Sequence, residues 1–332
     1  MGDDPHTPAG FHSLALAEPL SWWGTTPTPP RGRHDQDVAK HSHPSSPVAE
    51  EKQPLSELLR LPAGTVDLST LATDATDGFP GRGKADSAAV GAALLPELDD
   101  LQERLYANGR ATPESAPRVL LVLQGMDTSG KGGVIRHAIG MVDPQGIDIT
   151  PFKAPTKTEL AHPFLWRIER ALPGPGTIGI FDRSQYEDVL AVRVHELVPQ
   201  AVWESRYDEI NAWEADVVAS GTTIVKCFLH VSHDKQKERL LERLDDETRY
   251  WKYNPGDVDE RALWPAYMQA YEAALERCST QHAPWFVVPA DRKWYRNWAV
   301  AQLLVEHLRT LDLQWPAADF DVTTEQARVG AS

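Results

Sequence analysis

The nine residues Gly125-Met126-Asp127-Thr128-Ser129-Gly130-Lys131-Gly132-Gly133 separate an apolar run from a segment with helical periodicity. Before them, Arg118 to Gln124 contains the continuous hydrophobic stretch that is typical of a buried parallel strand. A glycine-rich turn would also contain such glycines, but strand, loop and helix together predict a phosphate-binding loop. The helix is indicated by apolar residues that recur at helical spacing, namely Val134, Ile135, Ala138, Ile139 and Val142.

The composition of this loop suits an oxyanion. Glycines let backbone N–H groups approach a phosphate closely, and Lys131 adds a positive charge at the helix N-terminus, where the helix dipole favours anions. We therefore expect Lys131 to act in catalysis. The loop residues expected to bind phosphate are Gly125, Ser129, Gly130, Gly132 and Gly133.

The residue after Lys131 is Gly132, whereas the common phosphate loop has a serine or threonine there that holds magnesium. Another group must therefore hold the metal. Asp127 lies inside the loop, and Asp182 ends a second apolar run, 177–181. Because Mg²⁺ prefers one or two carboxylates together with phosphate oxygens and water, we expect Asp127 and Asp182 to be its ligands.

From residue 118 onward, apolar strand patterns alternate with helical ones, which predicts an α/β fold with a parallel sheet covered on both faces. The expected architecture is a P-loop kinase-like three-layer sandwich with a helical lid, and ligands gather at the carboxyl ends of its strands. The predicted strands are 118–124, 147–153, 177–182, 222–230 and 285–289, and the predicted helices are 131–142, 158–171, 186–197, 200–219, 233–245, 257–278 and 294–311.

The chain divides into four segments by composition. Residues 1–53 are rich in proline, histidine, serine and threonine, which predicts a disordered leader with one apolar pair, Trp22 and Trp23. Residues 54–117 are expected to form an N-terminal arm with a helix over Leu94 to Tyr106. Residues 118–315 are expected to form the core with the phosphate loop and a lid at about 233–256, and 316–332 a flexible tail.

The 332 residues carry a formal net charge of −15, which argues against binding to nucleic acid or to a membrane surface. No segment reaches membrane-spanning length, and two distant cysteines give no disulfide framework, so we expect a cytoplasmic protein. If the ligand is a polyanion, lysines and arginines must be gathered in one groove.

Three cations outside the loop are candidates for that groove. Arg183 follows Asp182, and its planar guanidinium can grip phosphate oxygens bidentately. Arg193 lies seven residues after Tyr186 on a predicted helix, so both can face one side, although Arg193 can also pair with surface carboxylates. Lys153 ends the second predicted strand, where phosphate contact or a structural role is open to it.

The predicted lid helix carries Lys235, Arg239 and Arg243 at four-residue spacing, followed by Trp251-Lys252. A solvated charged face is one interpretation of this spacing. The other is a mobile lid, which closes over phosphates, excludes water and supplies cations. On that interpretation Arg239, Arg243 and Lys252 bind phosphate.

These motifs resemble the polyphosphate kinase 2 family of polyphosphate:nucleotide phosphotransferases over about residues 55–313. The resemblance rests on the loop 125–133, on Phe181-Asp182-Arg183-Ser184-Gln185-Tyr186-Glu187-Asp188-Val189-Leu190, on the lid cations, on Ala283-Pro284-Trp285, and on Pro289-Ala290-Asp291 with Lys293-Trp294. Glycine at position 132 is what this family is expected to carry.

The resemblance implies reversible, magnesium-dependent phosphoryl transfer between inorganic polyphosphate and a nucleotide, with manganese as an alternative metal, in a homo-oligomer. It implies that Asp127 and Asp182 hold the metal and orient phosphates, and that Lys131 and Arg183 stabilise the transferring group. Arg239 and Arg243 would close from the lid. Because the acceptor is a phosphate oxygen that is already anionic, alignment and charge neutralisation suffice for catalysis.

The Tyr186 to Leu190 stretch resembles the subgroup that accepts nucleoside monophosphates as well as diphosphates. That subgroup usually has asparagine where this chain has Asp182, so ADP or GDP is the expected acceptor and AMP stays open. Two other functions share these motifs. One is an ATP-dependent P-loop kinase for a small acceptor, and the other is a nucleotide- or polyphosphate-binding regulator without turnover.

Overall fold

The computed structural model describes residues 53–62 and 64–332. The predicted leader, including Trp22 and Trp23, therefore lies outside the described residues up to residue 52. The described part of the chain forms one compact unit by itself.

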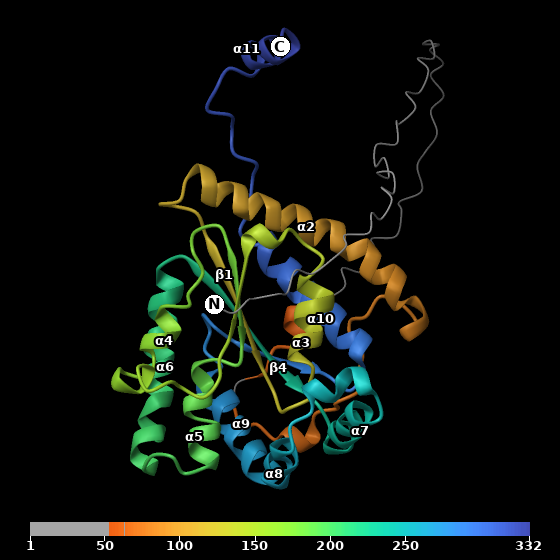
Figure 1. Ribbon diagram of the computed structural model, residues 1–332, viewed down its shortest axis with the longest axis vertical. Coiled ribbons are helices and arrows are strands. Elements are labelled where there is room, and N and C mark those ends of the chain that lie inside the picture. Colours follow the sequence, from red (N-terminus) through yellow and green to blue (C-terminus); the bar gives the residue numbers. More distant parts are fainter. Residues whose placement is uncertain (1–52, 63) are drawn as a thin grey trace, which may run out of the picture. The chain divides into compact units, whose positions relative to one another are not determined.

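A five-stranded, wholly parallel sheet runs through this unit (Figure 1). Its order is β2-β3-β1-β4-β5, which places the strand before the phosphate loop at the centre. All five predicted strands are confirmed, and the second ends at Pro151 rather than at 153. The strands are β1 (Arg118–Gln124), β2 (Ile147–Pro151), β3 (Ile178–Asp182), β4 (Thr222–His230) and β5 (Trp285–Pro289).

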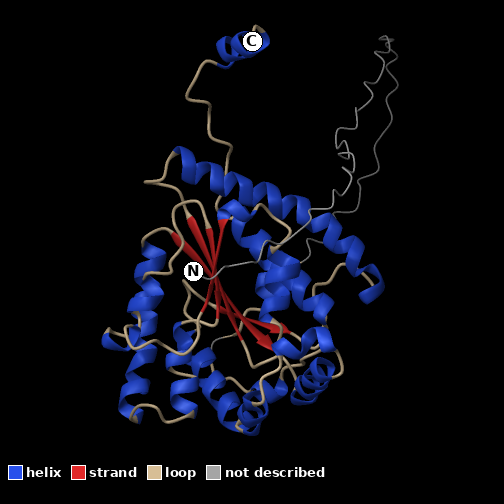
Figure 2. Cartoon of the chain, in the orientation of Figure 1, coloured by secondary structure: helices blue, strands red, loops and turns tan. Residues whose placement is uncertain are grey.

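Helices lie on both faces of the sheet, which confirms the predicted α/β fold (Figure 2). Helix α10 contacts both α2 and α3 on one face, and α6 packs on β4 from the other, next to α9. The α-helices are α1 (Leu55–Leu58), α2 (Ser87–Ala111), α3 (Lys131–Val134), α4 (Trp166–Glu169), α5 (Ala191–Val194), α6 (Gln200–Ala219), α7 (His233–Leu244), α8 (Gly256–Ala262), α9 (Trp264–Cys278), α10 (Lys293–Arg309) and α11 (Val322–Gly330).

Short 3₁₀ segments and one π-helical segment connect several of these helices. The π-helical segment, η3 (Ile135–Ile139), continues directly from α3 beside the phosphate loop. The 3₁₀ segments are η1 (Leu68–Thr70), η2 (Lys84–Asp86), η4 (Pro144–Gly146), η5 (Glu159–Ala161), η6 (Gln185–Asp188) and η7 (Glu247–Lys252).

Three predicted helices are wrong in their continuity. The predicted helix 158–171 is only η5 and α4, because Pro163 interrupts the backbone hydrogen bonds between them. The predicted helix 186–197 breaks at Leu190, whose ψ is −85°. The predicted helix 257–278 is two helices, because Pro265 starts a new one within the first turn of α9.

The N-terminal arm contacts the edge strand β5. Leu61 N–H donates to the Trp285 carbonyl at 3.0 Å, and Val287 N–H donates to the Leu59 carbonyl at 2.9 Å. Helix α2 is longer than the predicted 94–106, and its face with Leu98 and Leu105 is buried. None of the residues of α11 is buried, and the flexibility of the tail stays a prediction.

The phosphate loop begins where β1 ends, beside the carboxyl ends of β3 and β4. Leu123 is in register with Asp182, and Gln124 is in register with Phe228. The predicted candidates Gly125 and Asp182 therefore emerge at one edge of the sheet, where open parallel sheets bind ligands. Within the described ranges, none of the helices has the length and the apolar character that crossing a membrane requires.

Candidate active site

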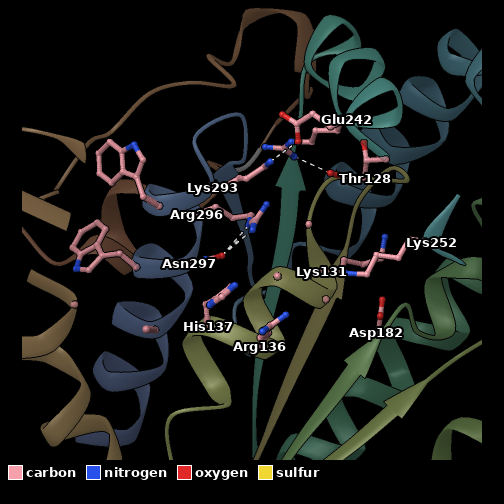
Figure 3. Close-up of a pocket in the computed structure, with 18 of the residues that line it drawn as sticks. Thr128, Lys131, Arg136, His137, Asp182, Glu242, Lys252, Lys293, Arg296 and Asn297 are labelled. Carbon is pink, nitrogen blue, oxygen red and sulfur yellow. Dashed lines mark hydrogen bonds and ion pairs between the residues drawn. The ribbon is translucent and has the colours of Figure 1, made fainter. Parts of the chain in front are cut away.

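A cavity of about 1070 Å³ opens at this edge of the sheet. Its walls are the phosphate loop, the end of β3, the segments α7 and η7 of the predicted lid, and the facing sides of α2 and α10 (Figure 3). Although the chain as a whole is acidic, basic side chains outnumber acidic ones in this groove, as a polyanionic ligand requires. Three carboxylates line the cavity, Asp127, Asp182 and Glu242, against nine cations, Lys131, Arg136, Arg183, Arg239, Arg243, Arg249, Lys252, Lys293 and Arg296.

Two glycines of the phosphate loop, Gly125 and Gly130, have positive φ values. Gly125 has φ 148°, and a Cβ there would lie 2.7 Å from the Leu229 carbonyl oxygen. Gly130 has φ 109°, a conformation that residues with a side chain rarely adopt. Thr128 takes φ 60° although it is β-branched, so the loop holds backbone strain at the cavity wall.

Lys131 lies at the start of α3 and is only 9% exposed. Its Nζ donates to the Gly125 carbonyl at 2.8 Å, across the loop. Burial and the nearby Arg183 cation lower the pKa of Lys131. The cation is therefore poorly compensated in the free protein, and an incoming phosphate would supply the missing negative charge.

Two loop hydroxyls are buried without a hydrogen-bond partner among the described residues: Thr128 Oγ1 and Ser129 Oγ. Thr128 lines the cavity, whereas Ser129 lies behind it. A buried hydroxyl without a partner loses free energy that a ligand oxygen can restore. The Thr128 hydroxyl is thus a further candidate to donate to a phosphate oxygen, on a residue to which the sequence analysis gave no role of its own.

Asp127 and Arg183 form an ion pair across the cavity floor, with Oδ1 and Nη2 2.8 Å apart. A second carboxylate, Glu187, lies 3.7 Å from Arg183 Nη1. Against the effect of burial, Glu187 and Asp127 together raise the pKa of Arg183, so its guanidinium stays charged. Arg183 itself has φ 67°, a second strained position at the site.

The donor set at this point fits a hard divalent cation. Asp127 and Asp182 both line the cavity, and within residues 53–62 and 64–332 no group of three histidine, cysteine or acidic residues could hold a metal alone. Mg²⁺ tolerates such a site because it keeps several waters and takes further oxygens from bound phosphates.

The turn after Arg183 is held by a buried polar network. Ser184 Oγ accepts from Gln124 Nε2 at 3.0 Å. Below it, Gln185 Nε2 and the Tyr186 hydroxyl both donate to Glu214 Oε1, at 2.9 and 2.7 Å. Glu214 pairs with Lys226 at 2.5 Å, and the side chains of both are fully buried. The sheet and α6 thereby fix the residues that follow Asp182 and Arg183.

The lid segments are held to one another by Arg243. Its Nη1 donates to the Lys252 carbonyl at 2.8 Å and to Asp257 Oδ2 at 3.1 Å, which ties α7 to η7 and α8. Trp251 is 78% exposed at the cavity mouth, and Lys252 Nζ lies 4.9 Å from its ring centroid. Lys252 and the exposed tryptophan are therefore available to a ligand from this side.

The profile of the family described as Polyphosphate kinase 2 (PPK2) matches residues 90–315. The chain belongs to the polyphosphate kinase 2 family. It is 46% identical over 255 residues to the AMP/ADP-polyphosphate phosphotransferase of Meiothermus ruber, and the match covers 77% of this chain and 93% of that protein. It is 44% identical over 234 residues to the ADP-polyphosphate phosphotransferase of Rhodopseudomonas palustris, and the match covers 67% of this chain and 79% of that protein.

A solved structure of the family has the same fold. The crystal structure of polyphosphate kinase 2 from Arthrobacter aurescens TC1 aligns with a TM-score of 0.80 and 50% sequence identity. The alignment covers 84% of this chain and 98% of that one. The resemblance inferred from the sequence motifs is therefore confirmed.

The structure brings together most of the residues predicted for a site of the polyphosphate kinase 2 family. Those that line the cavity are Asp127, Gly130, Lys131, Gly132, Gly133, Asp182, Arg183, Arg239, Arg243 and Lys252. Gly125 and Ser129 belong to the loop but do not line the cavity. The Gly125 carbonyl accepts from Lys131 Nζ.

Two predicted cations lie elsewhere. Lys153 is exposed and outside the cavity, and its carbonyl accepts from Arg167 Nη1 at 2.8 Å. Arg193 packs its guanidinium 4.8 Å from the Trp203 ring centroid and reaches the Tyr207 hydroxyl at 3.4 Å. The break at Leu190 is the reason, because it removes the continuous helix that would have put Arg193 on one face with Tyr186.

Arg239 lines the cavity but differs from a free lid cation. It is 5% exposed, and it donates to four backbone carbonyls at 2.6–3.2 Å, two of them in the phosphate loop. Lys293 was quoted only as part of the family motif and Arg296 not at all, although their spacing of one helical turn on α10 was a signal for two cations on one side of that helix. The cavity residues with basic side chains that were not predicted to bind phosphate are Arg136, His137, Arg249, Lys293 and Arg296.

Proposed function

We propose that this protein transfers a phosphoryl group reversibly between inorganic polyphosphate and a nucleoside diphosphate, ADP or GDP, with Mg²⁺ as the metal and Mn²⁺ as its substitute. The observation that carries the proposal is the excess of nine lysines and arginines over three carboxylates in one cavity around the phosphate loop. Such an excess suits a ligand with many phosphate charges, and the chain as a whole is acidic.

The cations lie on both sides of Lys131, which suits two polyanionic substrates, polyphosphate and a nucleotide, that meet there. On the lid side are Arg243, Arg249 and Lys252, and on α10 is Lys293. A polyphosphate chain and a nucleotide can then meet at the loop with their reacting phosphates next to Lys131 and Arg183. Membership in the polyphosphate kinase 2 family and the names of the relatives support both substrates.

In this reaction the side chains align the two substrates and neutralise the negative charge of their phosphates. The acceptor oxygen is anionic near neutral pH, so no general base is required. Lys131 and Arg183 would stabilise the transferring group, and each such cation supports the transition state by several kcal/mol. A divalent cation bound by Asp127 and Asp182 would neutralise phosphate charge and help align the substrates.

AMP is the second acceptor to test. The Meiothermus ruber relative is named for both AMP and ADP, whereas Asp182 adds a carboxylate beside the acceptor phosphate. Purified protein with metal and long-chain polyphosphate should be given ADP, GDP and AMP separately, with Lys131→Met as the control for contaminating kinases. ATP from ADP supports the proposal. A reaction that needs ATP and ignores polyphosphate would favour the small-acceptor kinase, and no product at all would favour a binding regulator.

The proposal extends to the assembly and location of the protein. We infer a homo-oligomer in the cytoplasm that binds phosphorylated small molecules and polyphosphate rather than nucleic acid. The formal net charge of −15 supports the last point, because nucleic-acid binding needs an extended basic face. Light scattering gives the oligomer, and a DNA-shift assay at low salt checks the exclusion.

A further inference from the structure

Two arginines from different helices donate hydrogen bonds to backbone carbonyls of the phosphate loop. Arg296 on α10 donates from Nη1 to the Ser129 carbonyl at 2.9 Å. Arg239 on α7 donates to the same carbonyl at 3.2 Å and to the Thr128 carbonyl at 2.8 Å. The carbonyls of Thr128 and Ser129 are thus fixed by the two guanidinium groups, and Thr128 is one of the strained residues of the loop.

The guanidinium of Arg296 also lies directly against the loop glycines. A Cβ at Gly133 would lie 2.6 Å from Arg296 Nη2, and one at Gly130 would lie 1.7 Å from Nη1. A Cβ at Gly132, between them, would meet nothing within 4 Å. Gly133 has no positive φ, so what requires glycine there is the position of Arg296 rather than the backbone conformation.

Both arginines are buried without an acidic partner. Arg296 is 3% exposed and Arg239 is 5% exposed, and in the described ranges neither forms an ion pair with a carboxylate within 4.0 Å. More distant carboxylates, Asp291, Glu242 and Glu238, partly offset the charge of Arg239 but not that of Arg296. Burial and the neighbouring Arg239 lower the pKa of Arg296 to about 9, so it stays charged at neutral pH at a free-energy cost. Its remaining partner is the amide oxygen of Asn297, at 2.9 Å from Nη2.

We propose that Arg296 is a positioning residue for phosphoryl transfer, which acts through the phosphate loop and whose buried charge is balanced by the phosphates bound in front of that loop. With Arg239 it fixes the carbonyls of Thr128 and Ser129, so that the loop amides and Lys131 face the cavity. This inference rests on the proposed function, since it assigns a role within the same site.

The charge argument separates this role from a merely structural one. A residue that only supports the fold destabilises the free protein when it is removed. Removing Arg296 instead relieves an unpaired buried cation, while the Ser129 carbonyl keeps Arg239 as a donor. The loss should therefore appear in the response to anions and in turnover, rather than in the stability of the free protein.

The first experiment compares the parent with Arg296→Met, which has similar reach but no charge. The melting midpoint without ligand should stay level or rise, the upward shift caused by inorganic tripolyphosphate should fall by about half or more, and kcat/KM should fall about 100-fold. A lower midpoint with an undiminished tripolyphosphate shift would overturn the proposal, and so would parental kcat/KM.

The second experiment is a double-mutant cycle with Gly133→Ala, whose added methyl meets only Arg296. Gly133→Ala alone should lower kcat/KM about tenfold or more, and in the Arg296→Met background it should cause less than about a further twofold loss. Losses that multiply independently would show that Arg296 does not act through this contact. If Arg296→Met does not fold, the same cycle is run with Arg296→Lys.

The outcome for the parent distinguishes this inference from the proposed function. If the parent makes no ATP from ADP and polyphosphate, the proposed function fails, and the tripolyphosphate shift still measures the charge argument. If the parent turns over and the variants behave like it, only the positioning role fails.

Discussion

Replacing Glu214 by glutamine should destabilise the protein far more than the loss of one hydrogen bond. Glu214 and Lys226 have fully buried side chains 2.5 Å apart. The change leaves the Lys226 cation without an anionic partner, among neutral acceptors such as the Tyr186 hydroxyl and the Cys278 carbonyl, at 2.8 and 2.7 Å. Breaking one side of a buried pair costs about 3–5 kcal/mol. For a unit of this size that corresponds to a fall in the melting midpoint of roughly 5–10 °C.

Equilibrium unfolding in urea, followed by tryptophan fluorescence and by circular dichroism, measures the change in free energy. The matched control is the double variant Glu214→Gln with Lys226→Met, in which both charges are gone while the new amide oxygen can still accept from Gln185 and Tyr186. The double variant should regain most of the lost stability, because the unpaired cation is removed. A loss below about 1 kcal/mol in Glu214→Gln, or additive losses in the double variant, would refute the reasoning.

Three further outcomes are expected. Lys131→Met should lower kcat by about 100-fold or more with the fold intact, measured as ATP formed from polyphosphate and ADP, and retention of a tenth of the activity would contradict its role. Burial lowers the pKa of Lys131 below its ordinary 10.5, so at alkaline pH the unfolded state binds more protons than the folded state. The stability of the parent relative to Lys131→Met should therefore rise as the pH rises towards 10.5, which urea unfolding at neutral and alkaline pH measures. Arg243→Ala should raise the KM for long-chain polyphosphate by about tenfold, because it frees the segment that contains Lys252. The difference in KM between variant and parent should narrow at high salt, which initial rates across a salt series measure. Equal KM values would count against the lid role.

The sequence by itself determined the sheet, the phosphate loop and the family. Those features are local: the continuous apolar run of β1 identifies a strand that is buried on both faces, and the glycines with Lys131 identify an anion site within nine residues. Because the carboxyl ends of parallel strands meet at one edge of a sheet, the sequence also predicts Asp182 near the loop, and the register of β1 with β3 confirms it.

Pro163 and Pro265 already marked two of the helix breaks in the sequence, but the break at Leu190 and the roles of individual cations were decided by tertiary structure. Leu190 breaks a helix whose local periodicity is acceptable, since Gln185 and Tyr186 are fixed to Glu214 on α6, and Arg193 is thereby directed to Trp203. Such contacts join residues far apart in sequence, so spacing along the chain cannot reveal them.

Arg239 and Arg296 illustrate the same limit most directly. On the sequence, Arg239 is one of three cations on a charged helix, and Arg296 is one arginine in an ordinary amphipathic segment. Only the folded chain shows that both guanidinium groups donate to the same loop carbonyl, that of Ser129, which lies 110 and 167 residues away in the sequence. A side chain with five donors can bind phosphate or backbone, and which partner it has depends on what packing brings within about 3 Å.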